Sequence, residues 1–185
     1  MAEKTNRNYN DYYDIIRGID SGAYGTVYKG REKKKNELRA IKVMNLDKIR
    51  ESLMYEEEKD DIEEKLKSYI NGFFEEYEIM KKCCNNNKNS VKCYEYFYNE
   101  DNFTIIMELC DMNLSKLLME KKKKENRYFN SKEILEIMKQ LNNTFKIMIE
   151  NRIIIHRDLK LENILIKNEN GQNIIKLTDY GCSKR

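Results

Sequence analysis

The spacing of apolar and polar residues divides the chain into a strand-rich first half and a mixed second half. Alternating or mostly apolar runs predict strands at 13–19, 26–30, 38–44, 91–98 and 103–109. Between 47 and 82 the apolar residues recur with a helical period among many charged residues. The pattern therefore predicts an antiparallel sheet with a helical segment between its third and fourth strands.

The second half alternates between helices and short apolar runs. Helical periodicity predicts helices at 114–119 and 131–151, separated by a basic loop at 121–124. Ser131 is the expected N-cap of the longer helix, because its hydroxyl can accept from the first free backbone N–H groups. Apolar runs predict strands at 153–155, 163–166 and 174–177. The last two of these are expected to form a hairpin.

The composition is that of a globular chain with nearly balanced charge. Its 185 residues include 35 Lys and Arg against 32 Asp and Glu, a formal net charge of +3. This balance excludes a basic nucleic-acid-binding arm or an acidic tail as the main feature, so no nucleic acid partner is expected. The chain contains no proline, which excludes collagen-like and proline-rich linker classes.

The cysteines and the hydropathy indicate the compartment in which the protein is expected. The five cysteines form no C-x-x-C pair, and with one histidine they cannot build a zinc site of the usual spacing. Free thiols in a reducing compartment are the simplest interpretation. No stretch approaches the roughly 20 apolar residues that cross a bilayer, so no membrane partner is expected and the location is cytoplasmic or nuclear.

Chemically active residue types concentrate near the end of the chain. Asp158 precedes Lys160 by two positions and Asn163 by five, and Asp179 follows beyond the expected hairpin. A carboxylate beside a lysine, with an amide and a second carboxylate, can orient a hydroxyl nucleophile and gather Mg²⁺ around a triphosphate. The set of residues therefore indicates phosphoryl-transfer chemistry.

Two motifs carry a family resemblance. The sequence H-R-D-L-K-L-E-N at 156–163 resembles the catalytic loop of eukaryotic protein kinases. The sequence D-Y-G at 179–181 resembles their D-F-G motif, with Tyr180 in place of phenylalanine. The resemblance implies an α+β, bilobal protein-kinase-like fold, with a small lobe of antiparallel sheet plus helix and a helical, truncated large lobe.

The resemblance also implies roles for these residues. Asp158 would orient the substrate hydroxyl and accept its proton, and Lys160 would stabilise charge on the transferring phosphoryl group. Asn163 and Asp179 would hold Mg²⁺. Lysine two residues after the aspartate is the Ser/Thr-kinase form of the loop, so the implied substrates are Ser and Thr hydroxyls of proteins.

The family's phosphate-binding loop has a counterpart upstream. The ATP-binding residues implied there are Ile19, Asp20, Ser21, Gly22, Ala23, Tyr24, Gly25, Thr26 and Val27. Gly22 and Gly25 match the second and third glycines of the motif, whereas Asp20 stands in place of the first. We expect a stiffer loop and weaker nucleotide binding from this exchange.

A lysine and a glutamate should form the family's ion pair. Ala40 and Lys42 match A-x-K, in which the lysine contacts the α- and β-phosphates of ATP. The helical motif selects Glu76 as its partner, with Glu75 and Glu78 as near alternatives.

The adenine site follows from the same resemblance. Met107 would be the gatekeeper residue, and backbone groups of Glu108 and Cys110 would bind the base. The apolar side chains expected to enclose the adenine ring are Val27, Ala40 and Leu165.

The implied domain organisation has four parts. These are an N-terminal extension at 1–12, a small lobe at 13–107 with a charged insertion at about 47–70, a hinge at 108–111, and the start of a large lobe at 112–185. The implied function is ATP-dependent phosphorylation of protein Ser/Thr hydroxyls. Two alternatives are a pseudokinase-like module that binds nucleotide or a partner, favoured by Asp20 and Tyr180, and an inactive truncated product. No regulatory partner is implied.

Overall fold

The computed structural model describes residues 7–22, 25–56, 61–153 and 156–183, and its chain forms two compact units. The first comprises Met1–Tyr77 and Cys93–Leu109, and the second comprises Glu78–Lys92 and Cys110–Arg185. Glu78–Lys92 thus belongs to the second unit, although the sequence placed it in the small lobe. The predicted lobe and hinge boundaries stay predictions.

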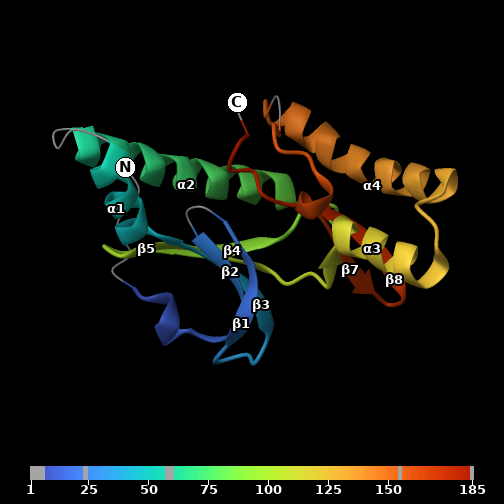
Figure 1. The fold of residues 1–185 in the computed structure, drawn as a ribbon, viewed down its shortest axis with the longest axis horizontal. Coiled ribbons are helices and arrows are strands. Elements are labelled where there is room, and N and C mark those ends of the chain that lie inside the picture. Colours follow the sequence, from blue (N-terminus) through green and yellow to red (C-terminus); the bar gives the residue numbers. More distant parts are fainter. Residues whose placement is uncertain (1–6, 23–24, 57–60, 154–155, 184–185) are drawn as a thin grey trace. The chain divides into compact units, whose positions relative to one another are not determined.

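An antiparallel sheet forms the first unit (Figure 1). Its strands are β1 (Tyr13–Ser21), β2 (Gly25–Glu32), β3 (Leu38–Asn45), β4 (Cys93–Tyr98) and β5 (Asn102–Glu108), preceded by a short 3-10 turn, η1 (Tyr9–Asp11). Their spatial order is β1-β2-β3-β5-β4. The five strands predicted from alternation are therefore confirmed, with ends that differ by up to two residues.

The two faces of this sheet have different roles. Lys42 on β3 is paired with Val27 on β2 and with Ile105 on β5. Directly opposed residues share a face, as do residues two apart on one strand, so Ala40 and Met107 lie on this face as well. The other face carries a buried apolar cluster of Tyr13, Ile41, Val43, Phe97 and Ile106.

Two helices follow β3 where the sequence predicted one helical stretch. They are α1 (Leu46–Glu56) and α2 (Ile62–Cys84). Leu46, Ile49 and Leu53 of α1 are buried against Ile62 and Leu66 of α2, so the charged segment has an apolar core of its own. This packing contributes to the stability of both helices, since most helical stability in proteins comes from burying an apolar face.

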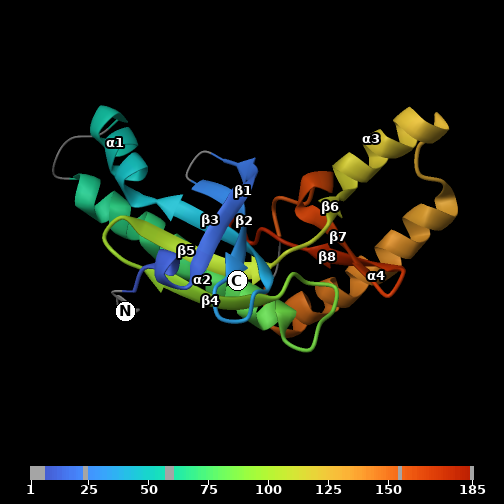
Figure 2. The ribbon, with the colours of Figure 1, turned by 90° about the horizontal axis from the view of Figure 1, so that it is seen from below.

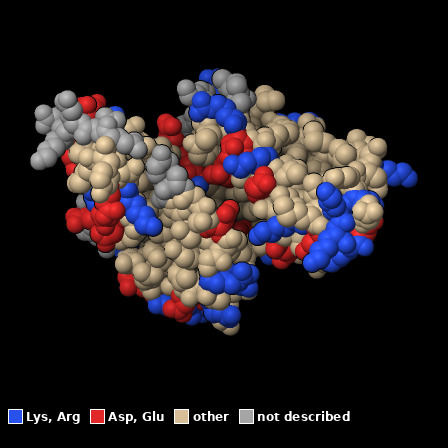
Figure 3. Space-filling view, in the orientation of Figure 1, with Lys and Arg blue, Asp and Glu red and all other residues tan. Residues whose placement is uncertain are grey.

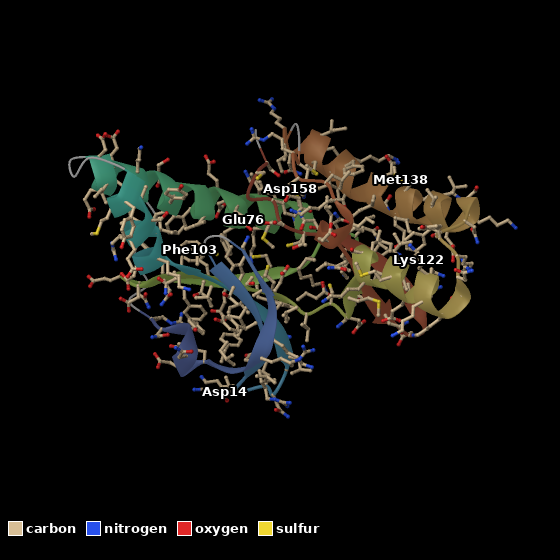
Figure 4. The ribbon with its side chains drawn as sticks, viewed as in Figure 1. Asp14, Glu76, Phe103, Lys122, Met138 and Asp158 are labelled. Atoms are coloured by element: carbon tan, nitrogen blue, oxygen red, sulfur yellow. The ribbon has the colours of Figure 1, made fainter. Side chains whose placement is uncertain are left out.

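Aromatic side chains fix α2 on the sheet. Phe74 makes edge-to-face contact with Phe103 of β5 at a centroid distance of 4.7 Å, and with Tyr96 of β4 at 5.4 Å. Phe103 (Figure 4) is fully buried and has the same parity on β5 as Ile105. The α2 helix therefore lies on the face of the sheet that carries Lys42.

The second unit contains a small sheet and two helices. Its elements are β6 (Met112–Asn113), α3 (Leu114–Glu125), α4 (Ser131–Glu150), η3 (Leu161–Asn163), β7 (Ile164–Glu169) and β8 (Gln172–Leu177). The β7–β8 hairpin is confirmed, with Asn170 and Gly171 at its turn in the left-handed region. The β8 strand packs against α4 (Figure 2), where Ile175 N donates to Gln140 Oε1 at 3.0 Å.

Two local predictions in this unit were wrong or fall in part outside the described residues. The basic segment 121–124 is not a loop but the last part of α3, over which Lys and Arg side chains gather (Figure 3). Lysine is a good helix former, and Lys124 pairs with Glu120 one turn earlier. In the predicted strand 153–155, Ile153 is buried but not in a strand, and 154–155 are not described.

The start of α4 also differs from the prediction. Asn130, not Ser131, is the N-cap: its side chain accepts from Glu133 N at 3.0 Å, and the Glu133 carboxylate accepts from Asn130 N at 2.9 Å. This reciprocal capping box satisfies two backbone donors at once. None of the described helices is long and apolar enough to cross a membrane.

Candidate functional site

A buried ion pair joins β3 to α2 in the first unit. Lys42 Nζ lies 2.6 Å from Glu76 Oε1 (Figure 4), and the Glu76 side chain is 4% exposed. A carboxylate so deeply buried requires a charged or hydrogen-bonding partner, which Lys42 supplies. Glu75 and Glu78 are exposed, so the structure selects Glu76 among the three glutamates that the sequence offered.

The β1–β2 connection is the candidate phosphate-binding loop. Gly22 N donates to Gly25 O at 2.9 Å, which closes the turn, and Ala23 and Tyr24 lie outside the described residues. A Cβ added to Gly25 would lie 2.4 Å from the Val43 carbonyl oxygen, so only glycine fits there. Asp20, which stands in place of the first glycine of the motif, is a residue of strand β1.

That exchanged residue, Asp20, is exposed, and its carboxylate accepts from Ser21 N at 2.9 Å. Ile19 also belongs to β1, and Thr26 lies opposite Ser21 on β2. The expected residues on both strands are thus placed beside the turn by the sheet register.

The residues expected around the adenine come from both units. In the first unit Met107 is buried opposite Ala40, and Val27 shares their face of the sheet. Glu108 is the last residue of β5. In the second unit Leu165 lies on β7, and Cys110 follows the end of the first unit in the sequence.

Two side chains converge on Asp158 in the second unit. Lys160 Nζ lies 2.7 Å from Asp158 Oδ2, and Asn163 Nδ2 donates to the same oxygen at 2.9 Å. The hydrogen bond from Lys160 is the main reason that the pKa of Asp158 lies below its usual value. The same bond raises the pKa of Lys160. At neutral pH the loop therefore presents a carboxylate beside an ammonium group.

The Asn163 amide has a defined orientation. Its Nδ2 also donates to the Asp158 carbonyl oxygen at 2.9 Å. Both neighbouring atoms are acceptors, so the nitrogen must face them and Oδ1 must face away. An amide oxygen held in this way is the kind of hard ligand that Mg²⁺ takes, and it fits the role expected for Asn163.

The backbone before Asp179 is held from two sides. Thr178 N donates to the Asn163 carbonyl oxygen at 3.1 Å, and the Thr178 carbonyl accepts from His156 Nε2 at 3.0 Å. Asp179 follows with φ of 62°, in the left-handed region that non-glycine residues rarely adopt. The two hydrogen bonds of Thr178 thus hold the backbone that immediately precedes Asp179.

His156 is a neutral, structural ring. Since Nε2 donates to a carbonyl, Nδ1 carries no hydrogen in the neutral ring, and it is buried without a hydrogen-bond partner among the described residues. Burial lowers the pKa of His156. The ring also packs on Tyr180 at a centroid distance of 5.1 Å. His156 therefore holds the backbone carbonyl of Thr178.

The neighbouring arginine contacts the end of the same segment. Arg157 has φ of 63°, and its Nε donates to the Cys182 carbonyl oxygen. Ser183 N donates to the Tyr180 carbonyl oxygen at 2.8 Å. The catalytic-loop segment and the segment around the D-Y-G motif therefore form one hydrogen-bonded structure.

A model of the protein kinase domain matches residues 13–185. The chain belongs to the protein kinase family. Its first unit has the sheet and helix of a kinase small lobe, and its second unit corresponds to part of a kinase large lobe. Membership of the protein kinase family implies ATP binding in general.

Several curated relatives of this chain carry Ser/Thr kinase names. Serine/threonine-protein kinase tousled-like 2 of Mus musculus is 30% identical over 183 residues, which cover 98% of this chain and 23% of the relative. The Homo sapiens protein gives the same identity, with 22% covered. The probable serine/threonine-protein kinase fnkE of Dictyostelium discoideum is 31% identical over 182 residues, covering 97% and 13%. The chain thus spans less than a quarter of these relatives.

Two residues that contact these motif segments, Thr178 and Ser90, have no signal in the sequence motifs. Thr178 acts through its backbone, which any residue could supply, so its identity reveals nothing. Ser90 is fully buried with its hydroxyl 2.9 Å from that of Tyr180. A tyrosine in the D-Y-G motif indicates that a polar partner is needed, but the sequence does not say where it lies.

Proposed function

We propose that this kinase-family chain catalyses ATP-dependent phosphorylation of Ser and Thr hydroxyls on protein substrates. The observation that carries the proposal is the Asp158 carboxylate, which remains ionised beside the Lys160 ammonium and is oriented by Asn163. A carboxylate in this state can orient a hydroxyl and accept its proton. Lys160 would then offset negative charge on the transferring phosphoryl group.

The first unit supplies the contacts to ATP in this proposal. Lys42, held by Glu76, would bind the α- and β-phosphates, while the turn between β1 and β2 offers backbone N–H groups to them. The residues proposed to enclose or bind the adenine are Val27, Ala40, Met107, Glu108, Cys110 and Leu165. The buried Glu76 carboxylate would keep the lysine ammonium in one position.

Asn163 Oδ1 and the Asp179 carboxylate would hold Mg²⁺. The bound ion supplies neutralisation of charge on the phosphate oxygens. Among the described residues no group of three His, Cys, Asp or Glu side chains could bind a metal by itself. Two protein ligands nevertheless suit Mg²⁺, since it usually keeps water and substrate oxygens in its coordination sphere.

The Lys160–Asp158 pair and the names of the relatives support Ser and Thr as acceptors, and the free cysteines support a reducing compartment. Lys160 is paired with Asp158, as in the Ser/Thr form of the loop, and the relatives carry Ser/Thr kinase names. The described cysteines are free thiols, which fits a cytoplasmic or nuclear location.

The test is transfer of ³²P from [γ-³²P]ATP to peptides that offer Ser, Thr or Tyr, followed by identification of the labelled amino acid. We expect label on Ser and Thr with Mg²⁺ present, and a loss of at least about 100-fold in Asp158→Asn. Asp101→Asn, an exposed turn variant, is the matched control and should retain activity. Undiminished transfer by Asp158→Asn would contradict the mechanism.

A second candidate function is nucleotide binding without transfer. It is favoured by Asp20, which takes the place of a loop glycine, and by Tyr180, which replaces the motif phenylalanine. The labelled-ATP assay, combined with a direct measurement of ATP binding, separates the two functions. A protein that only binds nucleotide would bind ATP but would transfer no label to any of the peptides.

A further inference from the structure

The Tyr180 hydroxyl is a buried polar group that the proposed chemistry does not use. Tyr180 is 0% exposed, and its hydroxyl oxygen lies 2.9 Å from the hydroxyl oxygen of Ser90, which is also 0% exposed. Burial raises the pKa of Tyr180, and so does the Cys83 thiol, which is also buried and lies near the same hydroxyl. A buried tyrosine hydroxyl requires such partners, because an unsatisfied one is costly. The surroundings are therefore built for tyrosine at this position.

The loop that carries Ser90 is itself firmly fixed in the second unit. The Asn89 side chain donates to Gln140 Oε1 of α4 at 3.1 Å and to the Ile175 carbonyl oxygen of β8 at 2.8 Å. The Asn89 carbonyl oxygen accepts from the Thr144 hydroxyl at 2.8 Å and from Leu177 N at 2.9 Å. A satisfied buried network of this kind is rigid. The serine hydroxyl is thus attached to a rigid support.

The attachment bears directly on Asp179. Its φ of 62° lies in the left-handed region, which aspartate adopts more readily than most residues with a side chain, so the contacts on either side decide whether the segment keeps this conformation. The Thr178 peptide holds the preceding side, through Asn163 and His156. On the following side the next residue is Tyr180, so its ring and hydroxyl contacts hold the other end.

We propose that Ser90 is a positioning residue, which binds the Tyr180 hydroxyl and thereby holds Asp179 in the backbone conformation used to coordinate Mg²⁺. This inference rests on the proposed function, since Asp179 acts as a ligand only if the chain binds ATP with Mg²⁺. Ser90 touches neither nucleotide nor metal in this role. It differs from a core-packing serine because its contribution depends on the hydroxyl of Tyr180.

The experiment compares Ser90→Ala, Tyr180→Phe and the double variant with the unchanged protein. Hydrogen–deuterium exchange of residues 178–183 measures whether the segment is held, without nucleotide. Each single variant should exchange about 2- to 10-fold faster there, as expected from one lost hydrogen bond, and the double variant no faster than Tyr180→Phe alone. Thr104→Val removes a buried hydroxyl that has no partner among the described residues, and it should leave this segment unchanged.

The second measurement is ATP binding as a function of Mg²⁺ concentration. Ser90→Ala should raise the Mg²⁺ concentration needed for half-maximal binding by about 2- to 10-fold, with no further increase when combined with Tyr180→Phe. Unchanged exchange in Ser90→Ala would overturn the positioning role. Faster exchange with an unaltered Mg²⁺ requirement would overturn the link to Asp179. If the unchanged protein binds no ATP at all, the proposed function fails, and the exchange data alone decide whether Ser90 holds the segment.

Discussion

Asn163 donates from one amide nitrogen to two atoms of Asp158, the carboxylate oxygen Oδ2 and the backbone carbonyl oxygen, each at 2.9 Å. Asn163 therefore holds both the side chain and the backbone of Asp158. It also sets which atom of the amide is left for another ligand, since a nitrogen facing two acceptors leaves only the oxygen on the far side.

Asn163→Asp is expected to disable this arrangement with almost no change in volume. The new carboxylate would face two acceptors, one of them charged, and so replace two hydrogen bonds by repulsion. Phosphoryl transfer should fall at least about 100-fold in the labelled-ATP assay. Asn170→Asp in the exposed hairpin turn introduces the same charge and should be near neutral, since aspartate also tolerates the left-handed backbone there. Equal losses in the two variants would show that charge, not contact, is responsible.

His156 should make stability depend on pH in one window. Its pKa is lowered in the folded chain, so below the ordinary histidine value of about 6.5 the unfolded chain binds the extra proton first. Stability is therefore complete above that value and falls as the pH drops below it. Because the chain has one histidine, the urea midpoint measured at about pH 7.5 and 5.5 isolates its contribution. His156→Gln should flatten this difference, and a slope that survives the substitution must come from other groups.

The Lys42–Glu76 pair should behave asymmetrically on mutation. Lys42→Met leaves the Glu76 carboxylate buried without its cation, and we expect a loss of roughly 1–3 kcal/mol in the free energy of unfolding. Adding Glu76→Gln removes the isolated charge and should recover part of the loss, although neither variant should bind ATP normally. Urea unfolding of both variants tests this. A double variant less stable than Lys42→Met would be inconsistent with an isolated charge as the cause.

The α4 capping box offers a pair of adjacent variants with opposite expectations. Asn130→Ala should destabilise the second unit by about 0.5–2 kcal/mol, since it removes the acceptor for Glu133 N. Ser131→Ala should change stability little, because this serine is the first helical residue and not the cap. Thermal unfolding of the two proteins side by side separates them, and a larger effect at Ser131 would reassign the helix start.

The strands of the first unit and the grouping of Asp158 with Asn163 were predictable from the sequence for different reasons. The strands of the first unit were predictable because they are short, alternating or mostly apolar runs, as expected where helix α2 covers one face of the sheet and an apolar cluster lies on the other. Asp158 and Asn163 could be expected to lie together because they are five positions apart in one loop, and the structure brings them into contact. Such signals are local, and each is contained within a few consecutive residues.

What the sequence did not predict depends on contacts between distant residues or on small energy differences. Nothing near Ser90 indicates that Tyr180 is its partner, since the two are 90 positions apart. The lysines at the end of α3 were interpreted as a loop from their charge, although Lys121 reaches Glu133 across the α3–α4 connection. The N-cap was misplaced by one residue because Asn130 and Ser131 are both good capping residues.

The alternation in β3 also limits which genetic changes the chain can survive. Ile41 belongs to the buried cluster on one face, while its neighbour Lys42 reaches Glu76 from the other. Inserting or deleting a single residue just before them would exchange the two directions, turning an ammonium group into the apolar cluster and an isoleucine toward the glutamate. A point substitution in this strand can have a small or a large effect, depending on the side chain that it changes. The insertion or deletion of one codon instead disrupts the buried cluster and the Lys42–Glu76 contact at the same time.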